Sequence, residues 1–237
     1  MTDQGDQGGL DKEEAAPDAG SFADKATQTL TERAYQALEE LIVTLQLPPG
    51  AVLSEQALVQ RLGIGRTPIR EALQRLALES LVTILPRRGV LVSEIDLRRQ
   101  LRVLELRREL ERFLAAKASE RATTAQRERL HAIARGMRAA AETSDDIAFM
   151  RLDRALNLLI ADAAHNEFAY RSVELLHGLS RRFWYQHYKQ VADLPLTARL
   201  HADLSQAIAD GDKPAATAAS DRLIDYIETF ARKTLEA

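Results

Sequence analysis

Apolar side chains recur every three or four residues from Leu30 to Leu45, the spacing that places them on one face of an α-helix. The run Pro48-Pro49-Gly50 ends this helix, because proline removes a backbone donor that a helical turn needs. Ser54 can cap a second, short helix, which ends at Gly63. The pattern therefore predicts one longer and one shorter helix before residue 65.

A third helix follows, for which the sequence predicts Thr67 as the N-cap and Pro68 as the first helical residue. Its apolar positions form one stripe that must pack on the rest of the domain: Ile69, Ala72, Leu73 and Leu76. Its other face carries Arg66, Arg70 and Gln74. Two short helices joined by a glycine-bearing turn predict a helix-turn-helix.

The residues after this helix have the composition of a β-hairpin. Two short β-prone runs, 81–85 and 90–92, are separated by Pro86-Arg87-Arg88-Gly89, in which the glycine permits a tight turn. We interpret this hairpin as a wing. Residues 29–94 are therefore expected to form a winged helix-turn-helix domain.

From residue 97 onward the pattern is only helical, with helices predicted at 97–121, 124–142, 145–163, 167–190, 196–210 and 214–235. Residues that can cap helix N-termini lie at three of the boundaries: Thr123 or Thr124, Ser144 and Asn166. Residues 97–237 are expected to form an all-α antiparallel bundle that could enclose a ligand cavity. The predicted fold class is mainly α.

Composition limits the class of protein further. A length of 237 residues suits two domains. Cysteine is absent and no basic start precedes an apolar run, which argues against a secreted, disulfide-bonded protein. No apolar stretch approaches the roughly 20 residues of a membrane span. We expect a cytoplasmic protein without a membrane partner.

Charge is distributed unevenly along the chain. The net charge of −3 argues by itself against a nucleic-acid partner. Residues 1–28, however, hold seven acidic side chains against two lysines and few large apolar ones, so we predict a disordered acidic tail there. Between Arg61 and Arg88, six arginines stand against two glutamates, a local charge of +4. This basic run could be a solvated surface or a DNA-binding face.

Three runs of residues carry a resemblance to a known family: Pro49-Gly50-Ala51-Val52-Leu53-Ser54-Glu55, Leu62-Gly63-Ile64-Gly65-Arg66-Thr67-Pro68-Ile69-Arg70-Glu71-Ala72-Leu73, and Pro86-Arg87-Arg88-Gly89. On these residues the N-terminal part resembles the GntR family of bacterial regulators. The helical remainder resembles the FCD effector domain of the FadR subfamily. The resemblance implies a homodimer that binds double-stranded operator DNA with one domain and a small-molecule effector with the other.

The chemistry of the third helix suits DNA recognition. Arg66 and Arg70 lie four residues apart near its N-terminus, so both could enter one major groove and bond the O6 and N7 acceptors of guanine. Thr67 could bond a phosphate, which free N–H groups of a helix N-terminus also attract. Gln74 continues this face. The alternative is an exposed surface on which Arg70 contacts Glu71 or Gln74.

In the predicted wing, Arg87 and Arg88 could contact the DNA backbone, and the resemblance places Gly89 against DNA. Exposed arginines are also common in turns that bind nothing. Gln56 occupies a position at which some relatives carry a DNA-contacting arginine. That contact is therefore expected to be weak or absent in this chain.

The resemblance also implies a metal site, of which this chain keeps a part. Many FCD domains bind a divalent metal with an Asp-x3-His pair and one histidine from each of the last two helices. Asp153 and His201 match this pattern, but Asn157 and Leu223 stand where histidines would. Zinc or nickel on Asp153, Asn157 and His201 is the only cofactor candidate, and the lost histidines should weaken it. We favour a hydrogen-bonded Asp153 and His201 pair without metal.

The same three polar residues could instead bind the effector, because they interrupt inward-facing apolar stripes and a buried polar group needs a partner. Arg107, which resembles an arginine that opens many FCD domains, and Arg182 could each pair with an effector carboxylate. The alternative is a salt bridge within the domain, such as Arg107 with Glu111. Further side chains of the 167–190 helix could line a cavity or only pack: His177, Trp184, Tyr185, His187 and Tyr188.

Together these features predict a ligand-responsive transcriptional repressor that binds a pseudo-palindromic operator as a homodimer and senses a small organic acid. A constitutive DNA-binding protein, whose helical domain only dimerises, is a second possibility. A third is a metal-dependent enzyme with Asp153 and His201 at its centre. No nucleophile elbow, phosphate loop or complete ligand triad supports catalysis. We therefore expect a protein that is not an enzyme.

Overall fold

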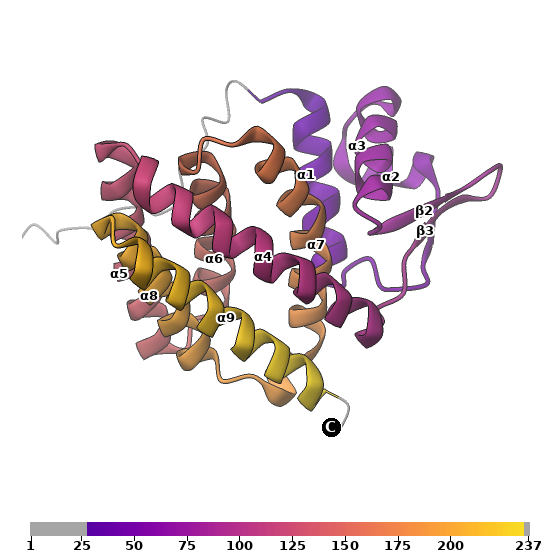
Figure 1. Ribbon diagram of the computed structural model, residues 1–237. Coiled ribbons are helices and arrows are strands. Elements are labelled where there is room, and N and C mark those ends of the chain that lie inside the picture. The colour runs from indigo at the N-terminus through magenta and orange to yellow at the C-terminus, as the bar shows by residue number, and fades with distance from the viewer. Residues whose placement is uncertain (1–27, 235–237) are drawn as a thin grey trace, which may run out of the picture.

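Two groups of elements follow one another in the computed structural model, which describes residues 28–234 (Figure 1). The first is a winged-helix domain and the second is built from helices alone. The chain is thus mainly α, as predicted from its periodicity. The acidic tail predicted for residues 1–28 lies outside the described residues, apart from Gln28.

The winged-helix domain contains, in order, α1 (Leu30–Val43), β1 (Val52–Leu53), α2 (Glu55–Leu62), α3 (Arg66–Leu78), β2 (Val82–Leu85) and β3 (Gly89–Val92). The strands form an antiparallel sheet of order β1-β3-β2, with Val52 opposite Leu91 and Val82 opposite Val92. The hairpin of β2 and β3 was predicted, but β1 was not, because two residues are too few to show a period. The apolar stripes of α1 and α3 meet in one buried core.

Of the two N-caps predicted for α2 and α3, one is confirmed and one is wrong. The Ser54 side chain accepts a hydrogen bond from the backbone of Ala57 at 3.1 Å, as predicted for an N-cap. The prediction that Thr67 caps α3 is wrong, because the helix begins at Arg66 and Gly65 is its N-cap. Pro68 lies within the first turn, where its missing N–H has no intrahelical partner to lose.

Gly89 has a structural role that the sequence did not reveal. Its φ of +102° is one that side-chain-bearing residues rarely adopt, and a Cβ there would lie 2.5 Å from the Leu53 carbonyl oxygen in β1. The close approach of β1 to β3 therefore requires glycine, whether or not DNA also approaches this residue.

We expect Gly89→Ala to lower the free energy of unfolding by about 2 kcal/mol or more, because the strained backbone and the steric overlap add together. Urea unfolding would measure the loss. Gly63→Ala is a matched control, since Gly63 also has a positive φ of +65° but a Cβ there would meet nothing within 4 Å. Equal losses in the two variants would contradict the steric explanation.

The helical domain contains α4 (Leu97–Arg121), α5 (Thr124–Thr143), α6 (Asp146–Ala163), α7 (Glu167–Val191), α8 (Leu194–Asp210) and α9 (Lys213–Lys233). All six predicted helices are present, and each end lies within two residues of the prediction. Thr123 and Asn166 cap α5 and α7 as predicted. Ser144 does not cap a helix N-terminus: it ends α5 in the left-handed conformation, and Asp145 caps α6.

Helix α7 lies between the rest of the bundle and α1 of the winged-helix domain (Figure 1). Leu179 packs against the core of the winged-helix domain, and a Cβ on Gly178 would lie only 2.8 Å from Leu81 Cδ1. Within residues 28–234, no helix is long and apolar enough to cross a membrane. Helix α7 thus packs against both domains, and it also lines the pocket described below.

Candidate DNA-binding face and ligand pocket

Helix α3 presents the predicted polar face to solvent. Its apolar stripe is buried, whereas four side chains on the other side are exposed: Arg66, Thr67, Arg70 and Gln74. The alternative interpretation pairs the Arg70 side chain with Glu71 or Gln74. In the structure its Nε donates instead to Glu55 Oε2 at 2.8 Å. Both partners are substantially exposed, at 60% and 37%, so this ion pair contributes little stability and can be exchanged for another acceptor.

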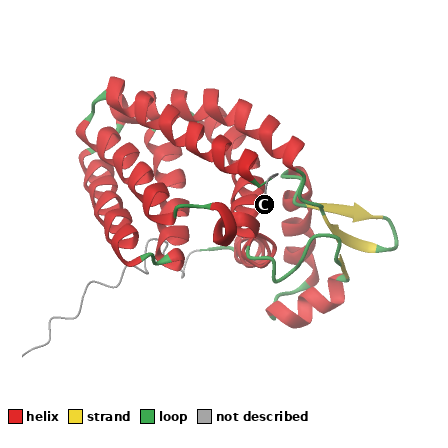
Figure 2. Ribbon diagram, turned by 90° about the horizontal axis from the view of Figure 1, so that it is seen from below, coloured by secondary structure: helices red, strands yellow, loops and turns green. Residues whose placement is uncertain are grey.

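The wing projects from the same domain, with its turn at the far end (Figure 2). Arg87 and Arg88 are exposed in that turn, and Arg87 adopts a positive φ of 63°. Gln56 is exposed in the first turn of α2. The DNA contacts predicted for these residues and for α3 thus all lie at solvent-accessible positions, apart from the half-buried Gly89.

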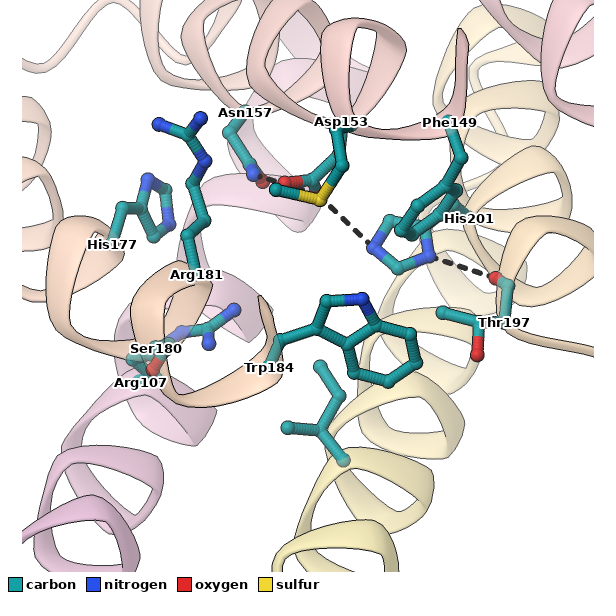
Figure 3. Close-up of a pocket in the computed structure, with 12 residues that line it drawn as sticks. Arg107, Phe149, Asp153, Asn157, His177, Ser180, Arg181, Trp184, Thr197 and His201 are labelled. Carbon is teal, nitrogen blue, oxygen red and sulfur yellow. Dashed lines mark hydrogen bonds and ion pairs between the residues drawn. The ribbon is translucent and has the colours of Figure 1, made fainter. Parts of the chain in front are cut away.

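A pocket in the helical domain, which we call the bundle pocket, is bounded by α4, α6, α7, α8 and α9 (Figure 3). The space between its walls, including the open mouth, is about 470 Å³. Its polar lining includes Arg107, Asp153, Asn157, His177, Ser180, Arg181, Thr197 and His201, and its apolar lining is Phe149, Met150, Trp184 and Ile227. Polar groups placed between apolar walls are typical of a site for a small organic molecule.

Three of the predicted site residues meet in one hydrogen-bonded group. Asp153 Oδ1 lies 3.2 Å from His201 Nε2 and accepts from Asn157 Nδ2 at 3.0 Å. His201 Nδ1 lies 2.8 Å from the Thr197 carbonyl oxygen, and the rings of Phe149 and His201 pack nearly perpendicular to each other, with their centroids 5.2 Å apart (Figure 3). Both ring nitrogens of His201 therefore face oxygen atoms.

The Asp153 carboxylate is held in its charged form. Burial raises its pKa, but the hydrogen bond and charge of His201, with the charges of Arg181 and His177, outweigh burial and lower the pKa to about 2. Asp153 is therefore an anion at neutral pH, and its charge is already matched by neighbouring side chains.

This donor set does not fit zinc or nickel. Among residues 28–234, no three His, Cys, Asp or Glu side chains are grouped so that they could bind a metal ion. Asn157 turns its amide nitrogen toward Asp153, the Nε2 of His201 is directed at the same carboxylate, and Leu223 is buried in the core. The arrangement matches the hydrogen-bonded pair favoured from the sequence, and we assign no role to a metal.

Arg107 lines the bundle pocket and also forms the predicted salt bridge, its Nε donating to Glu111 Oε1 at 2.5 Å. The same oxygen lies 3.3 Å from His177 Nε2. Burial raises the pKa of Glu111, but Arg107 and His177 more than compensate and lower it to about 2. Glu111 thus orients two of the side chains that face the pocket, Arg107 and His177.

Arg182, predicted to bind the effector, does not line the bundle pocket. It is 1% exposed, and it donates from Nη1 to the Ser93 carbonyl at 2.8 Å and from Nη2 to that of Glu94 at 3.1 Å. These bonds fix the segment that joins the wing to α4. Burial, followed by the charge of Arg99, lowers the pKa of Arg182 to about 10.

Arg181 is a second arginine in the pocket lining, and it was not predicted from the sequence. One helical residue turns the side chain by about 100°, so Arg181 faces the pocket and Arg182 faces the linker. The spacing from His177 to Arg181 and on to Trp184 would have placed these three on one face. The other aromatic candidates of α7 pack outside the pocket: Tyr188 stacks on Trp184, Tyr185 lies against Tyr188, and His187 against Phe183.

A pH-dependent loss of stability is expected from Asp153. Its folded pKa of about 2 lies below its ordinary 3.8, so its contribution is complete above pH 4 and is lost as pH falls toward 2. Between pH 6 and 3, wild type should lose about 1 kcal/mol more free energy of unfolding than Asp153→Asn. Urea unfolding at both pH values would test this against Glu128→Gln, an exposed carboxylate control. Identical losses in wild type and Asp153→Asn would contradict the assigned ion pair.

The fold and these two faces define a class of protein, a winged-helix DNA-binding protein with a helical ligand-binding domain. The chain belongs to the gntR family of bacterial regulatory proteins, whose model matches residues 30–92, and its residues 102–226 match the FCD domain. Members of this family are transcriptional regulators that bind DNA, and FCD domains bind small-molecule effectors. This chain is therefore a transcriptional regulator with a DNA-binding helix-turn-helix.

Similar sequences agree with this assignment, and a solved structure shares the fold. The chain is 27% identical over 207 residues to the HTH-type transcriptional repressor RspR of Escherichia coli, a match that covers 87% of this chain and 91% of the relative. A regulator from Streptomyces ambofaciens is 47% identical over 62 residues, 26% of each chain. The solved structure of E. coli McbR/YncC superposes with a TM-score of 0.76 at 22% identity, covering 88% of this chain and 100% of the other.

Proposed function

We propose that this regulator is a ligand-responsive repressor, which binds a pseudo-palindromic operator as a homodimer in the bacterial cytoplasm and senses a small organic acid. The observation that carries the proposal is the pair of guanidinium groups in the lining of the bundle pocket. Arg107 and Arg181 both line it, and each also pairs with a glutamate outside the lining, Glu111 and Glu39 respectively. Guanidinium groups beside apolar walls suit a small anion with a carbon skeleton.

Five polar groups of the pocket have a role in this proposal. Arg107, held by Glu111, and Arg181 bind the effector carboxylate, and Asn157 bonds another oxygen atom of the effector. Asp153 orients Asn157 for this purpose, and His201 holds Asp153 in place beside the effector. The apolar body of the effector lies against Trp184.

On the DNA side, Arg66 and Arg70 read guanines in the major groove, and Thr67 and Gln74 lie on the same exposed face. Arg87 and Arg88 of the wing contact phosphates, which carry no sequence information. Two copies related by a two-fold axis read the two halves of the operator. The name of the RspR relative supports repression as the outcome.

The test begins with selection of binding sites from random-sequence DNA by the purified protein. A thermal-shift screen then uses benzoate, D-gluconate, succinate and citrate, each with and without EDTA. We expect at least one acid to raise the melting temperature in both conditions, because binding to the folded state stabilises it. The same acid should weaken binding to the selected operator about tenfold, a coupling of about 1.4 kcal/mol.

Other results would favour another function. An acid that raises the melting temperature without changing operator affinity would contradict ligand-responsive repression. If none of the acids binds but the operator is recognised, the result would count against acid sensing and favour a constitutive DNA-binding protein whose helical domain only dimerises. Stabilisation that disappears with EDTA would contradict our conclusion that the pocket works without metal.

A further inference from the structure

Glu39 belongs to α1 of the winged-helix domain, but two arginines of the helical domain bind its carboxylate. Its Oε1 accepts from Arg181 Nη1 at 2.8 Å, and its Oε2 accepts from Arg154 Nη1. Glu39 is only 4% exposed. A carboxylate buried at a domain boundary is costly unless cations match its charge, so these two bonds hold α1 against α6 and α7.

Arg181 also faces the bundle pocket, which places it between the pocket and the winged-helix domain. A second cavity lies at the domain boundary and is lined by Glu39, Arg154 and Glu174 among others. Asn157, His177 and Arg181 line both spaces. Arg181 is thus accessible to an acid in the bundle pocket and also binds Glu39 of the DNA-binding domain.

The hydrogen bonds of Arg181 are incomplete. Nη1 donates to Glu39, but the buried Nε has no acceptor within hydrogen-bond distance among residues 28–234. A buried donor without a partner is destabilising, and a guanidinium binds a carboxylate best through two parallel N–H groups. A carboxylate in the bundle pocket would therefore gain a donor that Glu39 does not use.

We propose that Arg181 binds the carboxylate of the effector and that Glu39 is its internal competitor. This proposal rests on the acid-sensing pocket proposed above. In the free protein the guanidinium is held by Glu39, and an acid in the pocket draws it away. The bond between α1 and α7 then weakens, which leaves Glu39 to Arg154 alone.

The competition would connect the pocket to DNA binding through packing already present. Helix α1 packs against α3, the helix that carries Arg66 and Arg70, so a change in the position of α1 relative to α7 also moves the DNA-binding face. Linkage between two binding equilibria is reciprocal. If the contact between Glu39 and Arg181 lowers the affinity for the acid by some factor, the bound acid lowers the equilibrium constant of that contact by the same factor.

The position of the only tryptophan permits a direct test. Trp184 lines the bundle pocket, so its fluorescence reports events there without a label. Acetate serves as the probe, titrated at constant ionic strength into the full-length protein. Glu39→Gln keeps the shape of the side chain and removes its charge, and we expect it to lower the acetate concentration at half-saturation about fivefold or more.

Glu174→Gln is the matched control. Glu174 lines the same boundary cavity but pairs with Arg75 of α3 at 2.8 Å, so its neutralisation should leave acetate binding unchanged. Glu39→Asp retains the charge and shortens the side chain, and should give a smaller increase in acetate affinity than Glu39→Gln. This second variant keeps the test decisive if Glu39→Gln fails to fold.

The outcomes separate this inference from the proposed function. If wild type binds acetate but neither Glu39 variant binds it more tightly, the competition is wrong and the acid-sensing pocket stands. Equal increases in Glu39→Gln and Glu174→Gln would show a general effect of charge and would also overturn the competition. If acetate changes the fluorescence of neither wild type nor Glu39→Gln, the pocket does not bind carboxylates and both proposals fail.

Discussion

Arg66→Ala and Arg70→Ala should each weaken specific operator binding by about 1–3 kcal/mol, which is roughly 5- to 150-fold, and relax the choice of base at one position. Both side chains are exposed on the face of α3 opposite the buried stripe, so their removal leaves the core intact. Electrophoretic titrations of selected and scrambled operators would measure the effect.

Two controls distinguish base recognition from loss of charge. Arg135→Ala removes an exposed arginine of α5 and should leave DNA binding unchanged. Arg88→Ala in the wing should weaken binding to both DNAs alike and flatten the salt dependence. Wild-type discrimination between the two DNAs in both α3 variants would remove base recognition from these arginines.

Arg127→Met is expected to lower the free energy of unfolding by about 3 kcal/mol, because hydrogen bonds from a charged donor each contribute about 1.5–3 kcal/mol and several are lost together. Arg127 Nη1 donates to the carbonyls of Ile208 and Ala209, at 3.2 and 2.9 Å. Nη2 and Nε reach Ser119 and Ala122, at 2.8 and 3.1 Å. These carbonyls lie at the C-terminal ends of α8 and α4, where helical N–H partners run out, although Ile208 also accepts from the Gly211 N–H at 3.1 Å.

Urea unfolding of Arg127→Met would measure this loss. Arg135→Met on the same helix is the control and should change the free energy of unfolding by less than about 0.5 kcal/mol, because an exposed side chain is removed. A loss in Arg127→Met no larger than in Arg135→Met would mean that water satisfies the carbonyl groups equally well.

The predicted recognition helix illustrates how far local patterns reach. The stripe of Ile69, Ala72, Leu73 and Leu76 is buried as predicted, because a period of 3.6 residues assigns faces to a helix without knowledge of its surroundings. The predicted N-cap of α3 is wrong. Thr67 has a side chain suited to capping, but the extended backbone of an N-cap residue is found at Gly65. The reason for glycine at position 89 was also beyond local pattern, because the oxygen that excludes a Cβ belongs to Leu53.

The pocket was predicted in part. Asp153, Asn157 and His201 were expected to share a cavity, and they lie together in the bundle pocket with Arg107. Their roles as ligands of an effector stay predictions. Arg182 was predicted to line the pocket, but Arg181 does. The two neighbouring arginines carry the same chemistry, and the elements packed around α7 decide which of them donates to the carbonyls of Ser93 and Glu94.

Periodicity, caps and turn residues act over a few neighbouring positions, so the helices, the wing hairpin and the resemblance to a family are all evident from the amino-acid order. The contact of Glu39 with Arg154 and Arg181, 115 and 142 residues away along the chain, is evident only in the folded molecule. Such a contact depends on how two finished domains pack, and no local pattern encodes that packing. The proposed competition between Glu39 and an acid for Arg181, which would couple acid binding to DNA binding, therefore follows from the packing of α1 against α6 and α7.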